Sequence, residues 1–230
     1  MNIVIIPARG GSQRIKKKNI KDFCGKPIIA YSIEAAKKSK IFDRIIVSTD
    51  SDEIANVSKK WGAEAPFKRP ENISDNYSTT NDVMFHAVNF IIKDKKNVNA
   101  VCCLYPTAPF ITPQNLKEGL KKFLTGKWKF VFSATKYSYP VFRSFLKEKD
   151  GGLKMLYPKH FKSRSQDFQA VMHDAGQFYW GKPNAWVNKE FSFSQDSTVV
   201  ELPNWCAQDI DTPEDWKQAE IKYKMLNKNL

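Results

Sequence analysis

Residues 3–19 read IVIIPARGGSQRIKKKN, an apolar run that enters a Gly-Gly turn dense in Arg and Lys. An apolar run without alternation is typical of a strand buried on both faces of a parallel sheet. Three further apolar runs alternate along the chain with longer helical patterns. This alternation predicts an α/β fold with a mostly parallel sheet flanked by helices. The predicted strands are 3–6, 44–48, 100–104 and 130–134, and the predicted helices are 28–38, 52–61, 80–92 and 113–124.

Length and composition narrow the class of protein. The chain has 230 residues, of which 42% are hydrophobic and 27% are charged. These values predict a single domain over residues 1–230, and they exclude a disulfide-dependent mini-fold and wholesale disorder. No apolar run reaches the roughly 18 residues that a membrane helix needs, and the first residues do not read as a signal peptide. The cysteines have no CxxC spacing, so we expect reduced thiols in a cytoplasmic protein that has no membrane partner.

The pattern changes after about residue 137. Residues 141–147 and 153–156 flank a Gly-Gly turn and predict a hairpin. We expect residues 137–175 to form an inserted element that serves association, and we therefore expect a homodimer. A final helix follows, because Thr212 reads as its N-cap, Pro213 as its first residue and Asp215 as the partner three positions after the cap.

The formal net charge of +13, from 37 Lys and Arg against 24 Asp and Glu, is unusual. It suits three classes of partner: nucleic acid, an anionic membrane surface, or a small polyanionic substrate. A nucleic-acid-binding protein is the alternative from another functional class. It is expected to show a basic stripe interleaved with aromatics or a known binding module, and the sequence has neither.

The turn after the first predicted strand is the strongest candidate site. Glycines let backbone N–H groups approach phosphate oxygens, and Arg and Lys neutralise their charge. The spacing is neither that of a Walker A loop nor that of a dinucleotide fingerprint, so a solvated turn remains the alternative. Its place at the carboxyl end of a strand favours a phosphate site. The candidate residues are Ala8, Arg9, Gly10, Gly11, Ser12, Lys18 and Asn19.

Asp209 and Asp211 form a second candidate site. Carboxylates at positions i and i+2 of an extended chain project to one side, and this spacing suits a hard divalent cation such as Mg²⁺. The alternative is that the two residues only begin and cap the C-terminal helix. The pattern itself leaves both readings open.

Other candidates lie in or beside predicted loops. Arg69 precedes a proline, and Thr79 and Thr80 belong to a hydroxyl cluster that also suits a helix cap. Tyr105 follows a predicted strand, where prolines also stiffen the turn. His173 precedes the aromatic segment 174–181, whose side chains are more often core than a binding platform.

Taken together, these residues resemble a known family. The ordered motifs ARGGS at 8–12, KN at 18–19, FDRIIVSTD at 42–50, RP at 69–70 and DIDT at 209–212 are similar to those of cytidylyltransferases that make CMP-activated acidic sugars. The similarity runs over nearly the whole chain. Segments 102–110, 174–181 and 208–216 most resemble the members that act on pseudaminic acid.

The resemblance implies a Rossmann-like nucleotide-binding domain with a small inserted dimerisation element. It implies CTP and an acidic α-keto sugar as partners, and Mg²⁺ as the cofactor. Arg9 and Lys18 then hold the triphosphate, with Ser12 and Asn19 in the same loop. Arg69 with Thr79 or Thr80 contacts the cytidine and ribose, and Asp209 and Asp211 hold Mg²⁺. On the sugar side the resemblance gives Tyr105, Arg143, Arg164, His173 and Gln177.

Two positions depart from the pattern of the N-acetylneuraminate enzymes. Tyr105 stands where they have Gln, and His173 stands where they have Arg. Both positions belong to the sugar side, so the departures leave the nucleotide motifs intact. A different nine-carbon α-keto acid is expected, with N-acetylneuraminate and a 3-deoxy-octulosonate as the alternatives.

Overall fold

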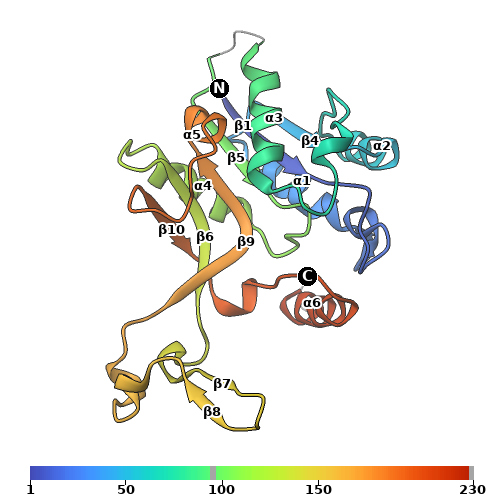
Figure 1. The fold of residues 1–230 in the computed structure, drawn as a ribbon. Helices are drawn as coiled ribbons and strands as arrows, with labels where there is room; N and C mark the ends of the chain where they lie inside the picture. The colour runs from blue at the N-terminus through green and yellow to red at the C-terminus, as the bar shows by residue number, and fades with distance from the viewer. Residues whose placement is uncertain (94–96, 228–230) are drawn as a thin grey trace.

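The computed structural model describes residues 1–93 and 97–227 and is built around one six-stranded sheet (Figure 1). The strand order is β10-β6-β9-β5-β1-β4, and every pairing is parallel except those of β9, which runs antiparallel to β5 and β6. The predicted α/β class with a mostly parallel sheet is confirmed. The strands are β1 (Asn2–Pro7), β4 (Arg44–Ser48), β5 (Ala100–Leu104), β6 (Phe130–Lys136), β9 (Met172–Gly181) and β10 (Ser197–Glu201).

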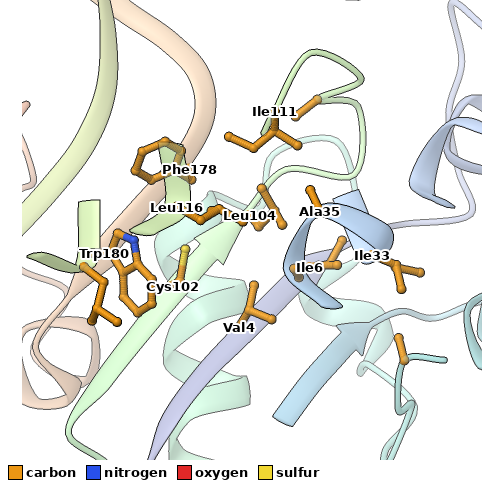
Figure 2. Close-up of a cluster of buried hydrophobic side chains, with 14 of the residues drawn as sticks. Val4, Ile6, Ile33, Ala35, Cys102, Leu104, Ile111, Leu116, Phe178 and Trp180 are labelled. Atoms are coloured by element: carbon orange, nitrogen blue, oxygen red, sulfur yellow. The ribbon is translucent and has the colours of Figure 1, made fainter. Parts of the chain in front are cut away.

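Helices cover both faces of the sheet, as the apolar strands require. Successive residues of β1 point to opposite faces. Val4 and Ile6 pack with residues of α1 and α4, together with Phe178 and Trp180 of β9 (Figure 2), whereas Ile3 and Ile5 pack with α3 and α5. The helices are α1 (Ile28–Ser39), α2 (Asp52–Trp61), α3 (Thr80–Lys93), α4 (Pro113–Phe123), α5 (Pro183–Val187) and α6 (Pro213–Leu226). No helix within the described ranges is long and apolar enough to cross a membrane.

Strand β9 is longer than the aromatic segment 174–181 that the sequence shows. It begins at Met172, and its first residues pair with the end of β6, after a register shift between Phe132 and Ala134. Strand β10 and helix α5 were not expected, because each is only five residues long and a period is hard to detect in so short a segment.

Residues 137–171 leave the sheet between β6 and β9 and project away from the body (Figure 1). They contain the predicted hairpin, formed by β7 (Phe145–Lys147) and β8 (Leu153–Met155). Residues 172–175 of the expected element 137–175 belong to β9 in the structure. Phe142 contacts the rings of Tyr157, His160 and Phe168, so this projecting element, residues 137–171, has a small aromatic cluster of its own.

Helix α6 begins as the sequence predicts. The Thr212 hydroxyl accepts from the Asp215 N–H, and the Asp215 carboxylate accepts from the Thr212 N–H in return. Trp216 and Tyr223 of α6 then pack edge-on against Phe23, which is fully buried. This packing places residues 209–211, just before the helix, beside the loop that follows β1, where Lys18 contacts Ile210 and Asp211.

Candidate active site

A cavity of about 360 Å³ opens where β1 and β5 end, bordered by the start of α3 and the segment before α6. This is where an α/β sheet places its ligands. Most of the predicted nucleotide and metal residues converge on it although they come from four distant parts of the chain. The predicted residues that line it are Arg9, Ser12, Lys18, Asn19, Arg69, Thr79, Thr80, Tyr105, Asp209 and Asp211.

The Gly-Gly loop is held by contacts behind the cavity wall. The buried Asn19 side chain donates to the Arg9 carbonyl over 2.9 Å. The Gly10 N–H donates to Asp50 Oδ1 over 2.8 Å, and a Cβ on Gly10 would lie 3.1 Å from Ser51 Cβ. In the part of the chain that the structure describes, the cavity lining does not include Ala8, Gly10 or Gly11. Gly10 therefore anchors the loop to the end of β4, and its N–H does not face a phosphate.

Cations gather at one end of the cavity. Lys18 Nζ lies 2.7 Å from the Ile210 carbonyl and 3.1 Å from Asp211 Oδ1. Arg14 Nη2 lies 2.9 Å from Asp211 Oδ2, so the Asp211 carboxylate bridges two cations. Arg9 lines the same cavity and donates to the Asp75 carbonyl. Sequence reasoning missed Arg14, because nothing in a local pattern separates it from the other cations of the loop.

Asp209 and Asp211 both reach the cavity, as the spacing predicts. Desolvation, and after it the charge of Asp211, raises the pKa of Asp209, although that residue is exposed. A divalent cation bound between the two carboxylates would reduce the electrostatic repulsion between them, so the pair fits a hard ion that prefers oxygen ligands. Within residues 1–93 and 97–227, no group of three or more His, Cys, Asp or Glu could hold a metal. An ion here would therefore take its other ligands from water and substrate.

Arg69 is buried beside the cavity, with 4% of its surface exposed. Its Nη2 donates to the Ser48 carbonyl, whereas its Nε has no hydrogen-bond partner among the described residues. Burial lowers the pKa of Arg69 to about 10; the carboxylate of Asp50 opposes this shift and the charge of Arg9 adds to it. The guanidinium still carries its charge at neutral pH and retains a donor for a ligand.

A second cavity, of about 300 Å³, adjoins the first across Thr79, Thr80 and Tyr105, which line both. Its remaining wall is mostly aromatic, with Asp174 as its carboxylate. From the sequence, the aromatic residues of β9 were interpreted as core. The loop after α5 has no side-chain periodicity that would have drawn attention to it. The residues that sequence reasoning missed here are Asn81, Asp174, Tyr179, Trp186, Phe191, Ser192 and Phe193.

The other predicted sugar residues lie elsewhere in this chain. Gln177 is buried, and its Nε2 donates to the Cys206 carbonyl over 2.6 Å. His173 is exposed and packs against Tyr137. Arg143 and Arg164 lie in the projecting element, where Arg143 donates to the Ser163 carbonyl and Arg164 pairs with Asp167. Among the described residues, none of these four lines either cavity.

Comparison with known proteins gives independent evidence about the chain as a whole. The sequence profile of the family described as "Cytidylyltransferase" matches residues 3–141. The chain belongs to this cytidylyltransferase family. It is 46% identical to pseudaminic acid cytidylyltransferase of Campylobacter jejuni, and the alignment covers 97% of each chain. It is 30% identical to N-acylneuraminate cytidylyltransferase B of Danio rerio, over 94% of this chain and 50% of that protein.

A solved structure confirms the fold of this cytidylyltransferase. CMP:2-keto-3-deoxy-manno-octonic acid synthetase, in a complex with CTP, superposes with a TM-score of 0.71 at 15% identity, over 100% of this chain and 99% of the other. The family resemblance seen in the sequence is thus confirmed. The protein is a nucleotidyltransferase that uses CTP.

Proposed function

We propose that this cytidylyltransferase couples CTP to pseudaminic acid, an acidic nine-carbon α-keto sugar, and releases pyrophosphate. The observation that carries the proposal is the single cavity that joins Arg9 and Lys18 with Asp209 and Asp211. Such a cavity suits a triphosphate whose charge must be neutralised on two sides. The 46% identity over almost the full length to a pseudaminic acid enzyme supports the choice of sugar.

In the proposed reaction, the anomeric hydroxyl of the sugar attacks the α-phosphorus of CTP. The bond to the β-phosphate breaks and pyrophosphate leaves. Transfers of this kind depend on positioning and charge stabilisation, so no covalent enzyme nucleophile is needed. Arg9 and Lys18 stabilise the charge that develops on the leaving pyrophosphate, with Ser12 and Asn19 in the same loop. Arg69, Thr79 and Thr80 hold the nucleoside end.

The carboxylates of Asp209 and Asp211 are proposed to hold Mg²⁺, which when bound neutralises phosphate charge and polarises a phosphoryl oxygen. Asp211 has to leave at least one of its two cations for this purpose, and the incoming triphosphate offers Arg14 and Lys18 an alternative anion. The two aspartates differ in their surroundings. Of the two, Asp211 forms salt bridges with Arg14 and Lys18 in the described residues, whereas Asp209 forms none.

The second cavity is proposed to receive the sugar. It adjoins the nucleotide cavity, and its aromatic wall suits the apolar groups of a deoxygenated acidic sugar. Tyr105 lies between the two cavities, which agrees with the departure from the N-acetylneuraminate pattern at that position. Arg143 and Arg164 are proposed to bind the sugar carboxylate from the projecting element of a second copy, in a homodimer.

We also propose a cytoplasmic location, where CTP is made. Cys24, Cys102, Cys103 and Cys206 are all free thiols, and Cys102 and Cys103 of β5 are buried on opposite faces of the sheet. Structural disulfides are rare in that compartment.

The deciding experiment measures pyrophosphate release with CTP and Mg²⁺ against three sugars: pseudaminic acid, N-acetylneuraminate and a 3-deoxy-octulosonate. We expect kcat/KM to be highest for pseudaminic acid by at least about tenfold, because a sugar that fits the aromatic cavity is held for attack. Equal values for the three sugars would defeat the choice of substrate, and release without any sugar would defeat transfer to a sugar altogether.

A further inference from the structure

Both oxygens of the Asp211 carboxylate are engaged by cations, and this pairing competes with the proposed role of Asp211 as a metal ligand. Lys18 Nζ lies 3.1 Å from Oδ1, and Arg14 Nη2 lies 2.9 Å from Oδ2. The backbone of Asp211 is fixed as well, because its N–H donates to Asp215 Oδ2 in the cap of α6. A divalent cation on this carboxylate would lie beside two positive charges, so at least one of the two side chains has to move away.

Lys18 is held in place by a second acceptor. Its ammonium lies 2.7 Å from the Ile210 carbonyl, and only 21% of its side chain is exposed. This carbonyl remains available to Lys18 when the Asp211 carboxylate binds another cation. An ammonium has three donors, so Lys18 can hold the carbonyl and a phosphate oxygen at the same time.

Arg14 lacks such a second anchor. Its side chain is 64% exposed, and within residues 1–93 and 97–227 its one ion pair is with Asp211. Arg14 also lines the nucleotide cavity. A guanidinium presents a planar set of donors that matches phosphate oxygens, and a triphosphate carries more negative charge than one carboxylate. A nucleotide in the cavity would therefore draw Arg14 away from Asp211.

We propose that Arg14 is an exchangeable cation, which Asp211 holds until a triphosphate takes it over. Arg14 then competes with a divalent ion for Asp211, so the carboxylate pair binds metal weakly before the nucleotide arrives and more strongly afterwards. The triphosphate and the ion favour each other's binding, because each of them separates Arg14 from Asp211. This inference rests on the proposed function, since CTP is the anion and Asp209 and Asp211 are the metal ligands.

The exposure of the pair sets the size of the effect. An exposed ion pair is weak, so Arg14 lowers the affinity for metal severalfold and does not abolish it. Charges farther away are screened by salt over about 8 Å at physiological ionic strength. Lys16 provides the matched control, because it is an exposed cation of the same loop and, in the part of the chain that the structure describes, it lies outside the lining of both cavities.

The first measurement is the dissociation constant of Mn²⁺, an ion that prefers the same oxygen ligands as Mg²⁺. It uses nucleotide-free protein, and the free ion is counted from its electron paramagnetic resonance signal. We expect Arg14→Gln to tighten Mn²⁺ binding about three- to fivefold, because the competing charge is gone. Lys16→Gln removes the same charge and should change the constant by less than about 1.5-fold in about 0.15 M salt. In an Asp211→Asn background, Arg14→Gln should no longer tighten Mn²⁺ binding.

The second measurement is the dissociation constant of CTP, by calorimetry in the presence of EDTA so that no metal contributes. Arg14→Gln should weaken CTP binding about tenfold, because a charge-assisted hydrogen bond to phosphate is lost. Lys16→Gln should leave it within about twofold of wild type. The two effects of Arg14→Gln thus have opposite signs, whereas a merely structural role of Arg14 would weaken the binding of both ligands.

An Mn²⁺ affinity of Arg14→Gln that is unchanged or lower, or a gain that Lys16→Gln matches, would overturn the inference. Unchanged CTP binding in Arg14→Gln would also overturn it, because the triphosphate would then not take Arg14 from Asp211. Failure of the wild-type protein to bind CTP would instead overturn the proposed function. The two failures are distinguishable, since one concerns the variant and the other the wild type.

Discussion

The body of the molecule and the projecting element, residues 137–171, differ in how far their large apolar side chains are buried. In the body, Phe178 and Trp180 are fully buried between the sheet and its helices (Figure 2). In the element, Tyr139, Leu153 and Phe161 expose 84%, 67% and 71% of their surfaces. The body supplies its own core, whereas the element presents apolar side chains that this chain does not cover. An element that exposes several large apolar side chains is typical of an association surface, which supports the proposed homodimer.

The largest expected effect compares one phenylalanine from each region. Phe178→Ala should lower the free energy of unfolding by about 3–5 kcal/mol, because it leaves a cavity in a close-packed core. Phe161→Ala should change it by less than about 0.5 kcal/mol in dilute protein. Urea denaturation measures both. Similar losses for the two variants would mean that the element is as much part of the core as β9 is.

The next effect concerns the nucleotide cavity, which the body builds alone. Lys18→Ala should lower kcat/KM for CTP about 10²–10³-fold, because it removes a preorganised positive charge that stabilises the leaving pyrophosphate. Lys60→Ala, an exposed lysine of α2, is the control and should leave the rate unchanged. Equal behaviour of the two lysines would remove Lys18 from the site.

A smaller effect tests whether the element also contributes to catalysis. Arg164→Ala should raise KM for the sugar about tenfold and leave KM for CTP unchanged, since one charge-assisted hydrogen bond to a carboxylate is lost. Lys162→Ala, an exposed neighbour, should change neither value. If Arg164→Ala behaves as wild type in a protein that light scattering shows to be dimeric, then the element serves association only.

The smallest effect is electrostatic. The pKa of Asp209 is raised in the folded protein. Its carboxyl group therefore favours the folded state at pH values below the ordinary aspartate pKa, and this contribution to stability is lost as the pH rises through the raised pKa. Asp209→Asn should therefore raise the Tm at pH 7, without divalent ions, by about 1–3 °C, and should not raise it at pH 3. Asp167→Asn, from the exposed ion pair of the element, should not raise the Tm at either pH. A gain at pH 3 would show that the cause is not charge.

Local patterns predicted the features whose causes are local. The apolar run of β1 indicated a buried strand, and the N-cap of α6 depends only on Thr212 and Asp215, three residues apart. Asp209 and Asp211 were found because their spacing alone places both on one side of an extended segment. Arg69 and Thr80 were candidates because of their place in predicted loops, and the resemblance added the role of contacting the nucleoside.

The features that sequence reasoning missed depend on contacts between distant segments. Arg14 became a candidate only when its salt bridge with Asp211, almost two hundred positions away, was visible. The second cavity needs β5, β9 and the loop after α5 to meet, and the latter two lack a clear period of their own.

The amino-acid sequence was sufficient to predict the alternation of strands and helices, the basic loop after β1 and the carboxylate pair before α6. These follow from side-chain periodicity and backbone preference, which act over a few residues. The hydrogen bond from the Gly10 N–H to Asp50 and the antiparallel direction of β9 became visible only in the folded molecule. Such contacts arise when the burial of distant apolar segments brings polar groups together, and a buried polar group must then find its partner nearby.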